Sequence, residues 1–164
     1  MPIVLHRIDE RLIHGQVVVG WGGELHPERI VVVDDDLAGS TWEQELYAIG
    51  LPPEVTAEFT TVENARARLP KWRISRERVF VLTRDAATMA AFARGGLLRG
   101  EEINVGGLHH SPGRRQALPY VFLSAAEEDA LRDLAAGGAE VSARDLPTTR
   151  PVELEQLLQD GTAH

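Results

Sequence analysis

Short apolar runs rich in β-branched residues alternate with segments of helical spacing along the chain. From these runs we predict seven strands, at residues 2–8, 29–35, 57–62, 78–84, 102–107, 119–124 and 139–146. The runs that contain "IVL", "IVVV" and "VFVL" are apolar without alternation, which is typical of strands covered on both faces of a parallel sheet. Strands that alternate with helical segments indicate βαβ units.

Predicted helices occupy most of the intervals between these strands. Ser or Thr followed three residues later by Glu forms a capping box, and this pattern marks helix starts at Ser40, Thr60 and Ser124. We predict helices over 41–50, 62–70, 86–94, 125–136 and 151–159, the last of which begins with a proline. A helix over 16–25 is predicted from the βα rhythm alone, because its valines and glycines favour strand or loop.

The element order predicts a single α/β domain spanning residues 1–164. Its core is a doubly wound, mainly parallel sheet of about seven strands with helices on both faces. No internal repeat or linker divides the chain. Ligands of such folds bind beyond the carboxyl ends of the strands, which singles out the loops after residues 8, 34, 84 and 107.

Composition and charge exclude several classes of function. The 25 acidic residues outnumber the 17 basic ones, for a formal net charge of −8, which argues against a nucleic-acid partner. The absence of cysteine excludes disulfides, thiolate metal sites and cysteine nucleophiles. No apolar run approaches the ~18 residues of a membrane span and the opening lacks a signal-peptide pattern, so we expect a cytoplasmic protein.

Ionisable chemistry is concentrated in "RIDERLIHGQV", residues 7 to 17, directly after the first predicted strand. A phosphoryl group on His14 would require a neutral imidazole, and positive charge from Arg7, Arg11 or the following helix end disfavours the imidazolium. The same arginines would then neutralise the phosphoryl oxygens.

Neighbouring residues fit the same hypothesis. Asp9 and Glu10 would orient the arginines or hold the imidazole tautomer through its second nitrogen, and Gly15 would relieve backbone crowding. The residue types alone leave the alternative open that this is an ordinary solvated loop.

Two further stretches are weighed in the same way. "NVGGLHHSPGRRQ", residues 104 to 116, combines Gly106 and Gly107 at a strand end with Arg114 and Arg115, and is either a loop beside the phosphoryl site that supplies docking arginines or a plain turn. A second candidate is the acidic run Asp34 to Asp36. These residues could bind a metal together with the histidines of that loop, but their spacing matches no metal motif, so we favour a role in capping the next segment or lining the cleft.

The three tryptophans, Trp21, Trp42 and Trp72, suggest partial burial rather than a platform for stacking sugars. They stand far apart in the sequence, among residues typical of helices or turns.

The motif "RIDERLIHGQV" resembles the phosphorylation segment of enzyme IIB subunits in the mannose/fructose/sorbose family of the sugar phosphotransferase system. "RIVVVDDD", "INVGGLHHSPGRRQ" and "SAAEEDALRDLAAGGAEVSARDLP" resemble later segments of that family in the same order. In this family the histidine before the Gly-Gln pair carries the phosphoryl group, and His14 occupies that place. Glu10 and Leu108 stand where Asp and Met are commoner.

The resemblance implies a phosphotransferase of the protein-N(pi)-phosphohistidine–sugar type. We predict that His14, Arg11 and Asp9 are catalytic and that Arg7, Gly15 and Gln16 bind phosphate.

Partners also follow from the resemblance. A separate IIA protein would donate the phosphoryl group, and membrane IIC and IID subunits, with which the chain would associate peripherally, would hold the sugar that receives it. Neither a metal nor another cofactor is implied. Self-association is left open, as is the alternative of a regulatory or binding module that is phosphorylated on His14 but serves no transporter.

Overall fold

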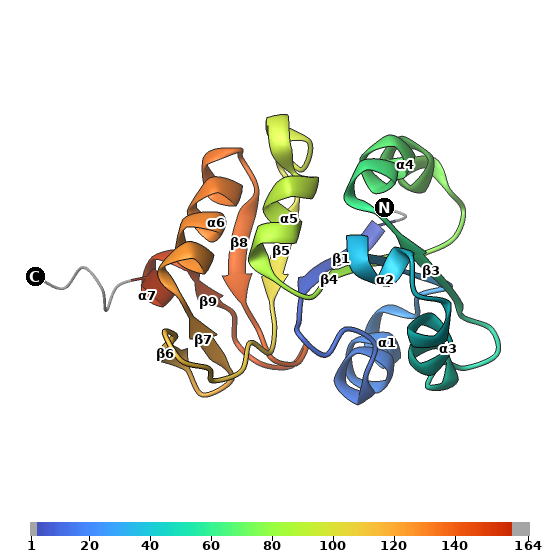
Figure 1. The fold of residues 1–164 in the computed structure, drawn as a ribbon, viewed down its shortest axis with the longest axis horizontal. Helices are drawn as coiled ribbons and strands as arrows, with labels where there is room; N and C mark the ends of the chain where they lie inside the picture. The colour runs from blue at the N-terminus through green and yellow to red at the C-terminus, as the bar shows by residue number, and fades with distance from the viewer. Residues whose placement is uncertain (1–2, 159–164) are drawn as a thin grey trace, which may run out of the picture.

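The computed structural model describes residues 3–158 and contains nine strands around which the helices pack (Figure 1). The strands are β1 Ile3–Ile8, β2 Arg29–Val33, β3 Thr56–Thr60, β4 Val79–Thr83, β5 Glu102–Val105, β6 Arg115–Leu118, β7 Val121–Leu123, β8 Glu140–Ala143 and β9 Val152–Glu153. The helices are η1 Gln16–Trp21, α1 Gly22–Leu25, α2 Asp35–Ala38, α3 Thr41–Ile49, α4 Val62–Ile74, α5 Ala86–Phe92, η2 Arg94–Gly96, α6 Ala125–Ala136 and α7 Leu154–Leu158.

Seven strands form one sheet in the order β3-β2-β4-β1-β5-β8-β9. All neighbouring pairs are parallel except β8 and β9. β1 therefore lies at the centre, between β4 and β5. The connection from β1 runs towards β2 and the connection from β4 runs towards β5, so the carboxyl end of β1 stands at the point where the chain changes direction across the sheet.

Two apolar cores cover the two faces of this sheet. The larger contains side chains of α4, α5, α6 and α7, and the smaller contains side chains of η1 and α2. The unbroken apolar runs of β2 and β4 are buried because both faces of these strands are covered. The predicted α/β class, with one mainly parallel seven-stranded sheet and helices on both faces, is confirmed.

The membership of the sheet differs from the prediction at one strand. Residues 119–124 were expected in the main sheet, but β7 instead pairs antiparallel with β6 in a separate hairpin closed by a two-residue turn at Pro119 and Tyr120. The seventh position in the sheet is taken by β9, in a segment predicted to be helical. That helix starts at Leu154 because residues 152 and 153 first pair with the edge of β8. Residues 2 and 159 of the predicted elements lie outside the described part of the chain.

Helix boundaries follow the predicted signals unevenly. The capping box at Ser124 is present in full, whereas Ser40 occupies the cap position without a side-chain hydrogen bond. Thr61, and not Thr60, caps α4, because Thr60 is the last buried residue of β3. That helix continues beyond Pro70, since burial of Trp72 against the sheet offsets the hydrogen bond lost at proline.

The helix predicted over 16–25 on topology alone is present, but its first part is a π-helix, η1, which leads into α1. A Cβ on Gly20 would lie 2.8 Å from Leu146 Cδ2, so glycine permits η1 to approach the loop after β8. π-Helical turns are rare and frequently occur at functional sites. Among residues 3–158, none of the helices is both long and apolar enough to cross a membrane.

Candidate functional site

The loop that follows β1 has its path fixed by both neighbouring strand ends. Asp9 N–H donates to the Thr83 carbonyl at 2.9 Å, and Glu10 N–H donates to the Gly107 carbonyl at 2.9 Å. Leu12 is fully buried and has a φ of 55°. This value lies in the left-handed region, which residues other than glycine rarely adopt. Such local strain persists only where the surrounding packing imposes it, and it is concentrated at functional sites.

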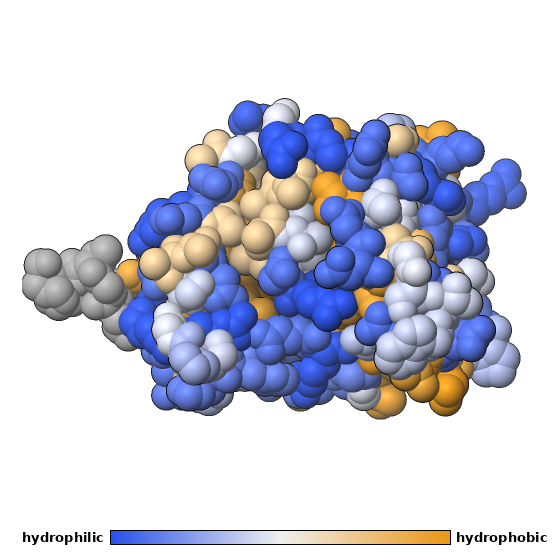
Figure 2. Space-filling view, viewed as in Figure 1, coloured by the Kyte–Doolittle hydropathy of each residue, from blue (hydrophilic) through white to orange (hydrophobic). Residues whose placement is uncertain are grey.

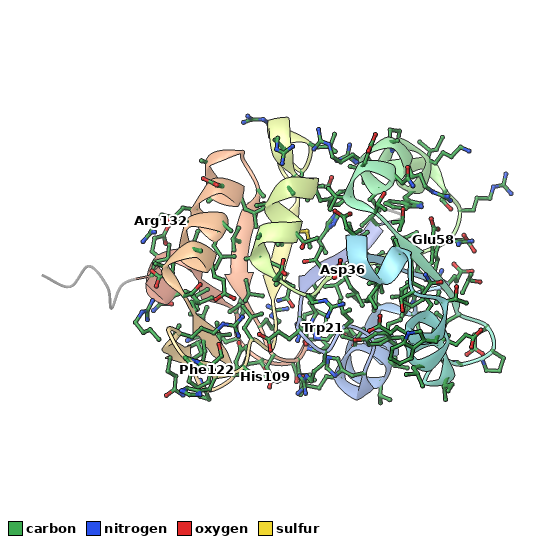
Figure 3. All side chains as sticks on the ribbon, in the orientation of Figure 1. Trp21, Asp36, Glu58, His109, Phe122 and Arg132 are labelled. Carbon is green, nitrogen blue, oxygen red and sulfur yellow. The ribbon has the colours of Figure 1, made fainter. Side chains whose placement is uncertain are left out.

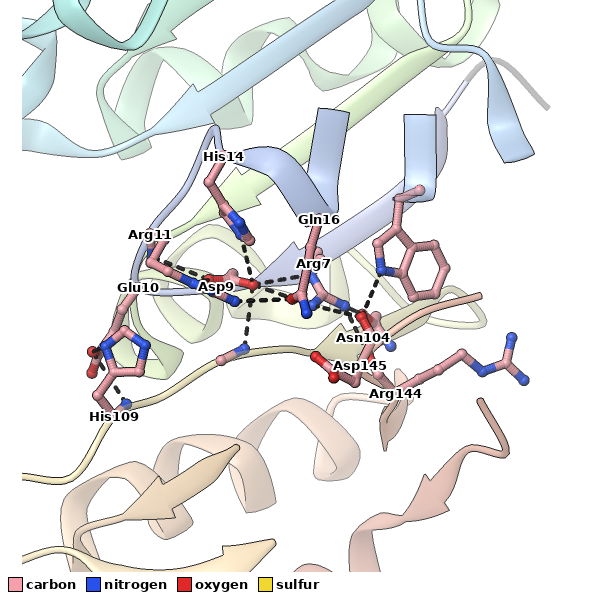
Figure 4. Close-up of polar contacts among 12 residues, drawn as sticks. Arg7, Asp9, Glu10, Arg11, His14, Gln16, Asn104, His109, Arg144 and Asp145 are labelled. Carbon is pink, nitrogen blue, oxygen red and sulfur yellow. Dashed lines mark hydrogen bonds and ion pairs between the residues drawn. The ribbon is translucent and has the colours of Figure 1, made fainter. Parts of the chain in front are cut away.

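At the end of this loop, the His14 ring lies against Asp9 (Figure 4). His14 Nε2 is 3.2 Å from Asp9 Oδ2, which is ion-pair distance, although Nε2 has no well-aligned hydrogen bond. Burial of Asp9 disfavours its charged form, but contact with His14 and the charge of Arg7 outweigh this effect and lower the pKa of Asp9 to about 2. A carboxylate at Nε2 favours the tautomer that has its proton there, which leaves the Nδ1 lone pair free.

Arg7 lies beneath the loop and has no solvent exposure. Its guanidinium donates to Asp9 Oδ2 at 3.2 and 3.3 Å, to the Asn104 side chain, and to the carbonyls of Arg144 and Asp145 at 2.8 and 3.2 Å. Burial lowers the pKa of Arg7 against the opposing effect of Asp9. The expected phosphate contact by Arg7 is not favoured by this position, because its donors already hold protein oxygens. The geometry instead favours Arg7 as a residue that positions Asp9.

The two glycines after β5 allow the chain to pass close to these side chains. A Cβ on Gly106 would lie 2.6 Å from Arg7 Nε, and one on Gly107 would lie 3.1 Å from Arg11 Nη2. Gly107 N–H also donates to Asp9 Oδ2 at 3.3 Å. The structure therefore brings the Gly-Gly pair to the His14 loop, as predicted, and gives it a steric reason.

We expect Gly106→Ala to destabilise the fold, because Arg7 is fully buried and held by five hydrogen bonds, and so has nowhere to move. Overpacking of this kind costs about 1–3 kcal/mol, measured as a lower midpoint of urea unfolding. Gly15→Ala is the matched control. Gly15 has helical dihedrals, and a Cβ added to it would meet no atom within 4 Å, so its stability should stay within about 1 kcal/mol of the wild type. Equal midpoints for Gly106→Ala and the wild type would contradict the steric role.

Gly15 therefore differs from the prediction that it relieves backbone crowding. Its φ of −51° and ψ of −46° are available to any residue, and the space beside it is open.

Arg11 and Gln16 lie on the solvent side of the same loop. The Arg11 side chain is 40% exposed, its Nε is 3.5 Å from Asp9 Oδ1, and its Nη2 donates to Gln16 Oε1 at 2.9 Å. Arg11 is thus tethered by Asp9 and Gln16 while part of its guanidinium faces solvent. This position suits contact with an incoming phosphoryl group.

Glu10 contacts neither Arg7 nor Arg11, contrary to one of the predicted alternatives. Its carboxylate accepts from the Arg114 guanidinium and lies 3.2 Å from His109 Nδ1. Arg114 also binds Glu127, the capping-box residue of α6, with its Nη2 2.6 Å from Glu127 Oε2. Arg114 therefore connects the His14 loop to α6.

Two other residues predicted to line the cleft, Asp34 and Arg115, contact residues outside the His14 loop. Asp34 caps α2 by accepting from Leu37 N–H and pairs with Arg84 Nε at 2.7 Å. Arg115 donates to Glu128 and to the Leu157 carbonyl, which ties the β6–β7 hairpin to α6 and α7. Arg115 is thus placed within the C-terminal packing and not at the His14 loop.

The sequence analysis did not identify the loop after β8 as part of the site, although residues of this loop contact Arg7 and Trp21. The Asp145 carbonyl accepts from Trp21 Nε1 at 3.0 Å, and the Trp21 ring stacks 5.2 Å from the Arg7 guanidinium carbon. In Figure 3 Trp21 and His109, which are far apart in the sequence, both lie in the lower half of the molecule. The carboxyl-edge rule, applied to the strand predicted at 139–146, would have identified this loop.

A histidine, a buried carboxylate and an exposed arginine thus meet at the switch point of a parallel sheet, where α/β proteins bind their ligands. The family model described as the PTS system sorbose subfamily IIB component matches residues 3–164. The chain therefore belongs to this family of phosphotransferase-system components for sugar transport.

Individual relatives agree with this assignment. The chain is 32% identical over 159 residues to the N-acetylgalactosamine-specific phosphotransferase enzyme IIB component 2 of Escherichia coli (strain K12), which covers 96% of this chain and 100% of that protein. It is 32% identical to the mannose-specific EIIAB component of the same strain but spans only 49% of it. The crystal structure of the IIBSor domain of the sorbose permease from Klebsiella pneumoniae superposes with a TM-score of 0.86 at 28% identity, covering 98% of both chains.

Proposed function

We propose that His14 accepts a phosphoryl group from a phosphohistidine on a IIA protein and passes it to a sugar held by membrane IIC and IID subunits. The observation that carries this proposal is the contact between His14 Nε2 and the buried carboxylate of Asp9. A carboxylate beside Nε2 holds the ring proton on that nitrogen and leaves the Nδ1 lone pair as the nucleophile, which agrees with the N(pi) type of phosphohistidine.

In the first transfer, the Nδ1 lone pair of His14 attacks phosphorus as the bond from phosphorus to the donor nitrogen breaks. The donor leaves as a neutral imidazole, and His14 becomes a phosphoimidazolium with its proton on Nε2. Asp9, whose pKa is about 2, stays ionised at neutral pH and stabilises that positive ring. In the second transfer a sugar hydroxyl attacks phosphorus and releases its proton to solvent, while the bond from phosphorus to Nδ1 breaks and His14 returns to the neutral imidazole with its proton on Nε2. Both transfers would place this protein in the cytoplasm, bound to the membrane transporter.

Several features support a preorganised site. Arg7 holds Asp9 from below, Gly107 N–H holds the same carboxylate from the side, and Leu12 fixes the loop backbone. Little rearrangement is then needed when the donor arrives, which is how positioning lowers the barrier to phosphoryl transfer.

The test is to incubate the chain with a IIA protein charged from phosphoenolpyruvate and to map the labelled residue by mass spectrometry at alkaline pH. A phosphoryl group on Nδ1 of His14 is expected. Label on any other residue, or no label with a donor known to be charged, would overturn the proposal.

Arg11→Lys is expected to raise the activation free energy of this labelling by about 1–3 kcal/mol, which slows it roughly five- to 150-fold. Lysine keeps the positive charge but loses the planar fork that matches two phosphoryl oxygens. Initial rates at limiting donor measure the effect. The control is Arg132→Lys on α6, whose guanidinium pairs with Glu128 and Asp129. Wild-type rates for both Arg11→Lys and Arg11→Ala would remove Arg11 from the site.

A further inference from the structure

Helix α3 presents an apolar face to solvent. Trp42, Leu46 and Ile49 are 66%, 58% and 78% exposed, and none of the nine residues of α3 is fully buried. Their spacing of four and three residues places the three side chains on one side of the helix. We call them the α3 apolar face. In Figure 2, orange atoms reach the surface at the lower right, where α3 lies in Figure 1.

This face continues into the loop that carries His14. A hollow of about 320 Å³ is lined by Ile13 from the loop and by Trp42, Leu46 and Tyr47 from α3, and it is bounded by Gly50. Ile13 is the residue immediately before His14. A protein that covers the hollow therefore lies next to the short segment of chain that carries His14.

Acidic side chains flank the apolar face on α3, and another lies on the adjoining α2. Glu45 on α3 and Asp36 on the adjoining α2 are exposed, and Glu43 borders the hollow itself. Apolar centres with charged rims are the usual composition of protein–protein contacts. The complementary surface is an apolar patch bordered by lysine or arginine.

We propose that the α3 apolar face docks the phosphoryl donor, a IIA protein that presents such a patch beside its phosphohistidine. The inference rests on the proposed function, because it assigns a partner to the same site. The mannose-specific relative is named EIIAB and is about twice as long as the matched region, so in that protein a further segment accompanies the B part. A donor seated on α3 is positioned by the hollow at Ile13 to present its phosphoryl group to the next residue.

A second copy of this chain is a poorer occupant. Stable self-association buries about 20–30 residues on each side, whereas this face offers three prominent side chains and a shallow hollow. A small apolar contact suits a partner that must leave after each transfer.

The test compares two phosphoryl donors on the same variants. Trp42→Gln and Ile49→Gln remove apolar surface without touching the His14 network. Labelling of His14 by a purified IIA protein that labels the wild-type chain should slow at least about tenfold at limiting donor, because truncated aromatic anchors dominate contact energies. Labelling by phosphoramidate, a small donor that needs no docking surface, should keep its wild-type rate.

Ile74→Gln is the matched control, since Ile74 is 84% exposed at the end of α4, among the helices of the other core. It should retain wild-type rates with both donors. Unchanged IIA-dependent rates in Trp42→Gln and Ile49→Gln would overturn the docking site while leaving the proposed function intact. Equal slowing with both donors would also overturn it, by showing a general disturbance of the site.

Two further outcomes would reassign the face and so overturn the proposal. One is a wild-type dimer, seen by light scattering, that Trp42→Gln dissociates without a change in IIA-dependent labelling. The other is normal labelling with slowed transfer to sugar in vesicles that contain the membrane subunits. Failure of the wild-type chain to be labelled by either donor would instead reject the proposed function.

Discussion

His14→Ala is expected to fold normally and to accept no phosphoryl group from a charged IIA protein. The His14 side chain lies at the surface end of its loop with 15% exposure, so its truncation leaves both apolar cores intact. No other histidine of the described chain combines a buried carboxylate at one ring nitrogen with an adjacent exposed arginine. Labelling at alkaline pH, where phosphohistidine survives, and circular dichroism of the same sample measure the two parts of this prediction.

His109→Ala and His110→Ala are the controls, because both residues belong to the loop that approaches Glu10. His109 is 56% exposed and pairs with Glu10, while the His110 ring packs at a right angle to the Phe122 ring at a centroid distance of 5.5 Å. Both variants should still be labelled. Full labelling of His14→Ala, or loss of label in His109→Ala alone, would contradict the central role of His14.

Asp9→Asn is expected to slow labelling by at least about a hundredfold, since hydrogen bonds to charged groups are worth about 1.5–3 kcal/mol each and Asp9 contacts both His14 and Arg7. A neutral amide no longer stabilises the phosphoimidazolium. It also removes the carboxylate that pairs with the buried Arg7, and breaking a buried ion pair in this way costs about 3–5 kcal/mol of folding stability. The rate must therefore be measured without denaturant, at a temperature where the variant is shown to be folded. Asp133→Asn, at an exposed position on α6, is the control.

The stability loss in Asp9→Asn should depend on pH. Because folding lowers the pKa of Asp9 from 3.8 to about 2, its charge stabilises the wild type fully above about pH 4, and that contribution disappears as pH falls through 2. Urea midpoints of variant and wild type should therefore converge on acidification. A difference that stays constant from pH 7 to pH 2 would show that the charge of Asp9 is not what holds Arg7.

Local signals in the sequence were enough to predict the fold class and to single out the charged loop around His14. Unbroken apolar runs such as those of β2 and β4 require cover on both faces, and the capping box at Ser124 fixes a helix start through local hydrogen bonds. Both kinds of signal can be read from neighbouring residues. The charged segment around His14 was recognisable for the same reason, because its residues are contiguous and follow directly after a strand.

Long-range packing determined which of these residues hold one another. Arg7 and Arg11 are equivalent as charges in the sequence, yet one is fully buried against Asp9 and the other is 40% exposed, because strand alternation and the loop after β8 enclose only the first. The exchange of β7 for β9 in the main sheet likewise depended on pairing with β8. Such pairings join residues far apart in the chain, and their free energy depends on tertiary contacts that no local pattern encodes.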